Sequence, residues 1–209
     1  MIVKKEYLFF ALLILIMGCA KSEKKVGKNI KIENAKTVVD KELNEFKKSS
    51  YFDYNKVMES KYKVMKNGDK FAYADLVLFY SYNKSKQFEI LPYSLIMVEK
   101  HKKYYYCSNV FENLVEFYTA QEFGNYYNGK EESLKRYLKN IELLHNEQKE
   151  YALYFLNLGA KNNDIMSVSY LEIINRNGFG VEENLKKADS LKKVLHILEK
   201  ERGLKTLTK

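Results

Sequence analysis

The sequence predicts an all-α protein built as an array of antiparallel helix pairs. The 209 residues include one Pro and nine Gly, too few turn residues for a β-sandwich of this size. Apolar residues recur along most of the chain at spacings near 3.6, the period of an amphipathic helix. Asn-Gly pairs at 67–68, 128–129 and 177–178 each follow such a stretch, where Gly supplies the left-handed C-cap of a helix rather than a hairpin turn.

The first 18 residues have the organisation of a secretory signal peptide. Two lysines precede an unbroken apolar run over 8–17, and Gly18 and Cys19 follow it. The alternative, a transmembrane helix, needs about 20 apolar residues, and this run is much shorter. The stretch Ile16–Cys19 resembles the lipobox of bacterial lipoproteins, in which the Cys thiol is acylated and becomes the new N-terminus. The resemblance implies lipidation at Cys19 and an extracytoplasmic protein that is lipid-anchored to a bacterial membrane.

Composition changes after the lipobox. Residues 19–36 are polar, Lys-rich and aperiodic, which predicts a flexible tether; an ordered basic arm that binds lipid headgroups is the alternative. A helical-repeat domain is expected over 37–203, followed by a disordered tail over 204–209. The formal net charge is +9, but export argues against nucleic acid as a partner. The charge indicates either a Lys-rich solvated surface or attraction to anionic headgroups or an acidic partner.

Within the helical domain, amphipathic segments follow one another with short breaks. They are expected as helices from about Thr37, then over 54–66, 69–83, Pro92 to about Lys102, 108–125, 131–145, 147–161, 165–176 and 185–202. Pro92 suits a first helical turn, and Asp164 and Asn184 can cap the last two helices. Segment 69–83 is apolar almost all round, which predicts burial on more than one side. Tyr118 is expected on the buried stripe of its helix, as are Tyr151 and Tyr154.

The C-terminal part carries a repeat pattern. Tyr170-Leu171 is followed by Asn177-Gly178-Phe179-Gly180-Val181 and then by Lys187-Ala188. This pattern resembles the Sel-one-like repeat, a variant of the tetratricopeptide repeat, over roughly 160–200. Its two glycines allow the loop to double back at positive φ, and the small Ala188 lets the facing helix approach closely. The resemblance implies an α-solenoid, a tetratricopeptide-like superhelix that holds a protein or peptide; an unrelated helical bundle is the alternative.

Cysteine usage leaves Cys107 alone once Cys19 carries lipid. No intramolecular disulfide can then form, so stability must come from packing. Cys107 follows three tyrosines and is expected to be a buried small hydrophobe, with a reactive or intermolecular role as the alternative.

Tyrosine and phenylalanine are the most distinctive components, with 18 Tyr, 12 Phe and no Trp. They are dense between 71 and 127, and tyrosine suits interfaces because its rigid apolar ring ends in a polar group. Packing in the core is the alternative for each residue. The candidate partner-binding residues are Tyr73, Tyr80, Tyr82, Tyr104, Tyr105, Tyr126 and Tyr127.

No catalytic or metal-binding motif is recognisable. His101, His145 and His196 are isolated, so neither a metal nor a cofactor is expected. The acidic pairs at 131–132, 147 with 150, and 182–183 indicate solvated faces. The sequence therefore predicts a non-enzymatic, membrane-anchored protein- or peptide-binding lipoprotein, of which an immunity-type inhibitor of a toxic effector is one specific version. The alternative is a helical hydrolase or cell-wall enzyme accessory domain that uses carboxylates.

Overall fold

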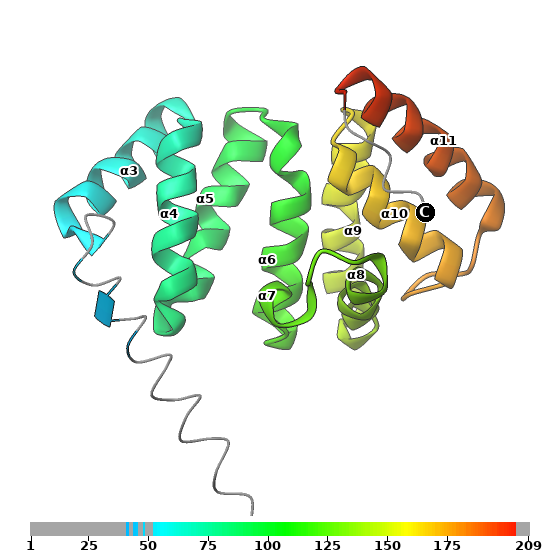
Figure 1. Ribbon diagram of the computed structural model, residues 1–209, viewed down its shortest axis with the longest axis horizontal. Helices are drawn as coiled ribbons and strands as arrows, with labels where there is room; N and C mark the ends of the chain where they lie inside the picture. The colour runs from blue at the N-terminus through cyan, green and yellow to red at the C-terminus, as the bar shows by residue number, and fades with distance from the viewer. Residues whose placement is uncertain (1–40, 42–43, 46–47, 49–51, 204–209) are drawn as a thin grey trace, which may run out of the picture. The chain divides into compact units, whose positions relative to one another are not determined.

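The described part of the chain is entirely helices and turns. A computed structural model describes residues 41, 44, 45, 48 and 52–203, and none of these residues lies in a strand (Figure 1). The predicted all-α class is confirmed. The expected signal peptide, Cys19, the tether and the tail at 204–209 lie outside the described residues, as does most of the helix expected from Thr37. The chain divides into two compact units, 1–41 and 42–209, and every described residue except Lys41 belongs to the second.

Most α-helices lie where the sequence pattern predicts them, but the helices expected over 92–102 and 131–145 are α-helical only to Leu95 and Leu138. In chain order the α-helices described are α3 (Tyr54–Asn67), α4 (Lys70–Tyr82), α5 (Leu91–Leu95), α6 (Cys107–Thr119), α7 (Phe123–Tyr126), α8 (Glu131–Leu138), α9 (Asn146–Lys161), α10 (Ile165–Asn177) and α11 (Leu185–Glu201). Shorter segments join them: the 3₁₀ turns η2 (Lys84–Ile90), η4 (Tyr104–Tyr106) and η5 (Lys139–Leu143), and a π turn, η3 (Ile96–Lys100). Among the described helices, none combines the length and the hydropathy that a membrane-spanning segment requires.

Polar side chains begin the last two helices where predicted. The Asp164 carboxylate accepts the Ser167 backbone N–H at 3.2 Å and caps α10. The Asn184 side chain accepts the Lys187 N–H at 2.9 Å and caps α11. Each cap satisfies a backbone donor that the first turn of a helix leaves free.

Two of the three Asn-Gly pairs end helices. Gly68 and Gly178 are the C-caps of α3 and α10, with φ of 61° and 67°. Gly129 also has a positive φ, 86°, but it lies in the turn before α8 and caps no helix. The C-cap interpretation is therefore wrong for the pair at 128–129, because α7 ends at Tyr126 and Tyr127 is already extended.

The described residues form two hydrophobic core clusters. One joins α6, α8, α9 and α10, and the other joins α3, α4 and the segment around α5. Helix α6 packs directly against α9 (Figure 1), although α7, α8 and η5 lie between them in the chain. This excursion explains why no regular repeat period is visible in the sequence over 90–145.

Several expected helix faces differ from those observed. Tyr151 and Tyr154 are exposed, and α9 instead buries Ala152, Phe155, Leu156 and Gly159. Tyrosine can occupy either environment, so a periodic Tyr does not identify the buried face.

The expected helices over 69–83 and 108–125 also need correction. Helix α4 is buried along one face only, because Phe71, Val77 and Tyr82 are exposed. The segment 108–125 is broken at Ala120, whose φ of 56° ends α6, and Tyr118 near that end is exposed.

Candidate functional site

A cavity of about 260 Å³ lies between α4 and α6 and is bordered by η2 and the start of α7. Four residues from α4, three from η2, four from α6 and three from 122–124 line it. They are Tyr73, Val77, Tyr80, Ser81, Lys84, Gln87, Ile90, Asn109, Glu112, Asn113, Glu116, Glu122, Phe123 and Gly124. The lining combines aromatic rings with amides and carboxyl groups, a composition suited to binding a polar group with an apolar stem.

Acidic side chains dominate the charge of the cavity. Glu112 and Glu116 lie one helical turn apart on α6, and Glu122 joins them from the segment before α7. Lys84 is the single basic residue of the lining, and its ammonium group is paired with Glu122. Lys84 also lowers the pKa of Glu116, whereas no cation among the described residues lowers the pKa of Glu112.

Burial makes both α6 carboxyl groups weaker acids. It raises the pKa of Glu112 to about 7, with a smaller contribution from the nearby charge of Glu116. Burial also raises the pKa of Glu116, and Glu122 adds to that effect. A cation bound in the cavity would lower both pKa values, because it stabilises the ionised carboxylates.

Neighbouring helices hold Glu112 in place. The Tyr170 hydroxyl of α10 donates to Oε1 of Glu112 at 2.5 Å, and the Tyr137 hydroxyl of α8 donates to its backbone carbonyl at 3.2 Å. Glu116 Oε1 accepts the backbone N–H of Phe123 at 2.6 Å. The carboxyl groups are therefore fixed by donors from outside α6.

A buried hydroxyl network supports the same wall of the cavity. Ser94 Oγ donates to the Ile90 carbonyl at 3.2 Å and accepts from Asn113 Nδ2 at 2.7 Å. Its single hydrogen is used, so the Tyr73 hydroxyl, 2.8 Å away, donates to it. Burial raises the pKa of Tyr73, which keeps this hydroxyl protonated as the donor.

The predicted partner-binding tyrosines fall into three groups. Tyr73 and Tyr80 are buried in the core and reach the cavity from α4. Tyr82 and Tyr105 are exposed. Tyr104, Tyr126 and Tyr127 are half-buried against the hydrophobic cluster that joins α6, α8, α9 and α10. The structure thus brings Tyr73 and Tyr80 together at the cavity and leaves the other five outside its lining.

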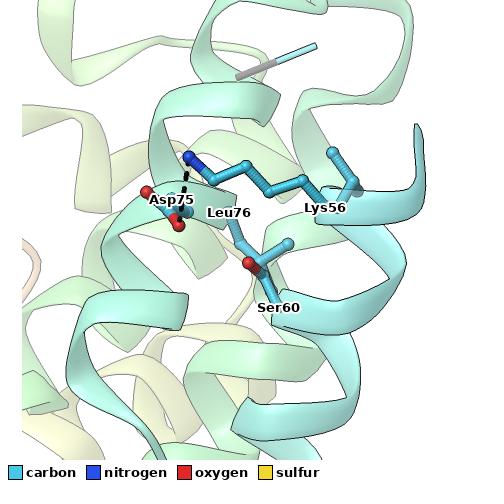
Figure 2. Close-up of a pocket in the computed structure, with 5 residues that line it drawn as sticks. Lys56, Ser60, Asp75 and Leu76 are labelled. Atoms are coloured by element: carbon cyan, nitrogen blue, oxygen red, sulfur yellow. Dashed lines mark ion pairs between the residues drawn. The ribbon is translucent and has the colours of Figure 1, made fainter. Parts of the chain in front are cut away.

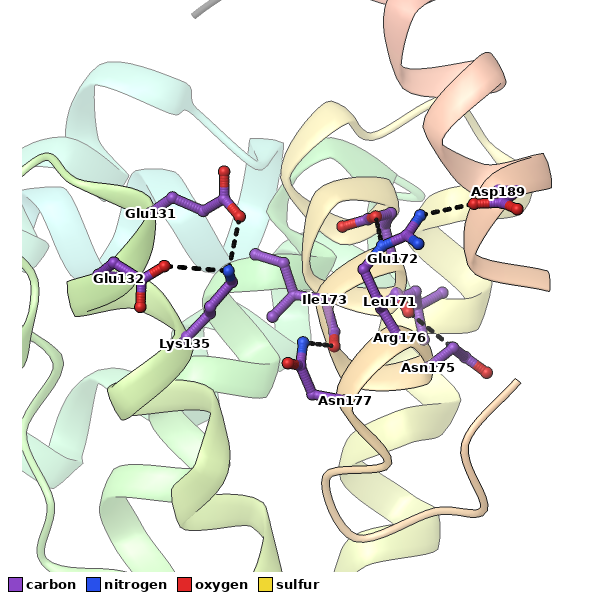
Figure 3. A network of polar contacts seen from close by, with 10 residues as sticks. All are labelled: Glu131, Glu132, Lys135, Leu171, Glu172, Ile173, Asn175, Arg176, Asn177 and Asp189. Carbon is purple, nitrogen blue, oxygen red and sulfur yellow. Dashed lines mark hydrogen bonds and ion pairs between the residues drawn. The ribbon is translucent and has the colours of Figure 1, made fainter. Parts of the chain in front are cut away.

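Two other polar features have clear structural roles. Lys135 pairs with Glu131 and Glu132 on the exposed side of α8, while Arg176 joins Glu172 to Asp189 and so links α10 to α11 (Figure 3). These charged residues are paired with one another, so neither group indicates a ligand-binding site.

A second, shallow crevice between α3 and α4 has essentially no free volume. Lys56 and Asp75 span it at 3.9 Å, above Ser60 and Leu76 (Figure 2).

The expected buried cysteine is confirmed, but the α6 carboxylates were not anticipated. Cys107 is fully buried, and burial raises the pKa of its thiol to about 12, so it is protonated. Glu112 and Glu116 were missed because an i,i+4 acidic pair beside an apolar stripe has the pattern of a solvated edge. The available signal was their position next to the buried Phe111 and Val115.

Comparison with known proteins adds no assignment. No protein-family model matches the sequence, and neither a curated protein nor a solved structure matches it significantly.

Proposed function

We propose that the chain is a lipid-anchored, extracytoplasmic lipoprotein whose helical domain binds a protein or peptide and is not an enzyme. The cavity between α4 and α6 carries the binding part of this proposal, and the lipobox-like stretch Ile16–Cys19 supports the lipid anchor. It offers fixed carboxyl groups beside aromatic rings, which suits a basic side chain presented by a partner. An immunity-type inhibitor of a toxic effector is one specific version of this role.

We propose that the helices form an α-solenoid of antiparallel pairs, a tetratricopeptide-like superhelix. The pairs α3 with α4, α9 with α10 and α10 with α11 each pack together, as such an array requires. Gly178 and Gly180 have positive φ, and Ala188 is fully buried, in keeping with the roles that the repeat pattern gives them. The start of the excursion, residues 122–124 at α7, borders the cavity.

The basic occupant follows from electrostatics. A carboxylate kept from water without a counter-ion is costly, and a guanidinium or ammonium group offsets that cost. Arg or Lys also brings an alkyl stem that can pack on Tyr73 and Tyr80. The partner would thus contribute a charged anchor at the centre of a larger interface.

Affinity capture tests this docking site. Wild type, a Glu112→Gln/Glu116→Gln double variant and an exposed control, Glu150→Gln on α9, are used to capture partners from a detergent extract. Gln keeps an oxygen for the Tyr170 and Phe123 donors, so the fold is retained. We expect at least about tenfold weaker capture by the double variant only. The loss of one member of a buried charge pair costs more binding free energy than a tenfold change in affinity represents. Equal capture by all three would exclude the cavity as the docking site.

Lipidation is tested separately through Cys19. Cys19→Ser should abolish incorporation of an alkyne fatty acid and leave an uncleaved precursor or remove the protein from the membrane fraction. Equal labelling of the wild type and the variant would exclude the lipid anchor.

A hydrolase using carboxylates is the second candidate. The observation that favours it is the raised pKa of Glu112. Glycoside hydrolases commonly use one protonated carboxyl group as the acid beside a second carboxyl group, and Glu116 would be that second group. If it is correct, Glu112→Gln abolishes release of soluble fragments from cell-wall material, while Glu150→Gln does not. If neither the wild type nor the control releases fragments, this alternative is wrong.

A further inference from the structure

Helix α3 carries an exposed apolar stripe beside its core face. The α3 stripe consists of Tyr54, Met58, Tyr62 and Met65, spaced so that all four share one helix face, and they are 42–73% exposed. The adjoining face of the helix buries Val57, Ser60 and Val64. Large apolar side chains gathered in this way mark an interaction surface.

Basic residues from two segments meet at the C-terminal end of this stripe. The basic cluster consists of Lys66, Lys70, Lys100, Lys102 and Lys103. Lys100 Nζ donates to the Met65 carbonyl at 2.6 Å, and Lys103 Nζ donates to the Gly68 carbonyl, also at 2.6 Å. These bonds place the 100–103 segment beside the end of α3.

Three acidic residues, Glu59, Asp69 and Glu99, lie near the basic cluster, and the charge of Lys103 lowers the pKa of Asp69. Glu59 is paired with Lys63 at 2.7 Å, outside the basic cluster. Asp69 accepts the N–H groups of Phe71 and Ala72 as the cap of α4, at 2.8 and 2.9 Å. The five lysines of the basic cluster therefore outnumber the acidic groups around them.

Two lysines also contact aromatic rings at the edge of the surface. Lys66 Nζ lies 5.2 Å from the Tyr62 ring centroid and donates to its hydroxyl at 2.8 Å. Lys70 Nζ lies 4.9 Å from the ring of Phe71, whose side chain is exposed. Aromatic rings flanked by lysine are characteristic of surfaces that rest at a membrane interface, where the rings enter the headgroup region and the ammonium groups meet phosphates.

We propose that the α3 stripe and the basic cluster form a surface that lies against an anionic phospholipid bilayer. The inference rests on the proposed lipid anchor, which would hold the domain near a membrane. The occupant is assigned from charge complementarity, because a basic cluster adjoining an apolar stripe matches a negatively charged, amphipathic surface. Contact at α3 would orient the domain on the membrane and leave the cavity between α4 and α6 to a partner.

Fluorescence quenching at a site beside the stripe tests the inference. The full-length lipidated chain carries an environment-sensitive dye at Asn55→Cys, next to Tyr54, or at Lys193→Cys on α11 as the control. Cys107 is fully buried and is not labelled. Each protein is reconstituted into vesicles that contain quencher-labelled lipid, made of phosphatidylcholine alone or mixed with phosphatidylglycerol.

We expect strong quenching only for the dye at position 55 in phosphatidylglycerol vesicles. Lys70→Glu with Lys102→Glu should weaken this association at least about fivefold, the factor that one basic residue contributes near an anionic surface. Equal quenching at 55 and 193 overturns the inference. A dye at 55 that is shielded from water but not quenched by lipid also overturns it, since another protein or a second copy then covers the stripe. Failure of the wild type to float with vesicles would instead refute the lipid anchor.

Discussion

Replacement of Gly159 by Ala tests the close contact among α6, α9 and α10. A Cβ at this position would lie 2.2 Å from Ser167 Oγ, 2.7 Å from Cys107 Cβ and 2.8 Å from Ser167 Cβ. The two Cβ atoms are fixed to their backbones, so a rotamer change cannot relieve the overlap. Overpacking of this kind costs about 1–3 kcal/mol, whereas Ala gains about 0.5–1 kcal/mol over Gly within a helix. We therefore expect a net loss of about 1–2 kcal/mol.

Gly124→Ala on α7 is the matched control, because a Cβ there would meet no atom within 4 Å. It should be neutral or slightly stabilising. Urea unfolding of both variants, followed by far-UV circular dichroism, measures the difference, and Gly159→Ala should also lower Tm by about 2–8 °C. If Gly159→Ala is as stable as the wild type, α9 does not approach α6 and α10 this closely.

Three further substitutions test the core, a cap and the cavity. Ala188→Leu should lower the free energy of unfolding by about 1–3 kcal/mol through overpacking between α10 and α11, while Lys187→Leu on the exposed side should change it little; equal effects in urea unfolding would contradict this packing. Asp164→Ala should cost about 2–3 kcal/mol, because it removes the acceptor of Ser167 and Ser108, and Asn184→Ala should cost about 1 kcal/mol; the reverse order of Tm values would argue against a buried cap. Since the pKa of Glu112 is raised to about 7 in the folded protein, the folded state keeps a proton that the unfolded state releases, and stability falls as pH rises from about 4.5 to above 7. Glu112→Gln should remove on the order of 3 kcal/mol of this decline, because one pKa unit corresponds to about 1.4 kcal/mol. An unchanged pH profile of Tm would show that Glu112 is not desolvated.

Local chemistry made the helix ends predictable. Asp164, Asn184 and the glycines at 68 and 178 act through neighbours a few residues away, so their roles can be inferred without the fold. The buried face of α9 could not be inferred in this way. It depends on Ala152 and Gly159, small residues whose burial follows from the close approach of α6 and α10.

The candidate site depended still more on tertiary structure. Of the tyrosines singled out in the sequence, Tyr73 and Tyr80 do reach the cavity, although they are core residues. Glu112 and Glu116 become cavity residues only because η2 and the start of α7 border the same space as α6. The periodic pattern that identifies a helix contains no information on which distant segment covers its polar edge.

Photo-crosslinking in cells tests the proposed function most directly. A photoreactive amino acid replaces Val77, which lines the cavity, or Lys193 on α11 as the control. We expect one adduct of defined mass at position 77, its loss when Glu112→Gln and Glu116→Gln are added, and no such adduct at 193. No adduct at 77, or the same adduct at both positions, would contradict a partner-binding site between α4 and α6.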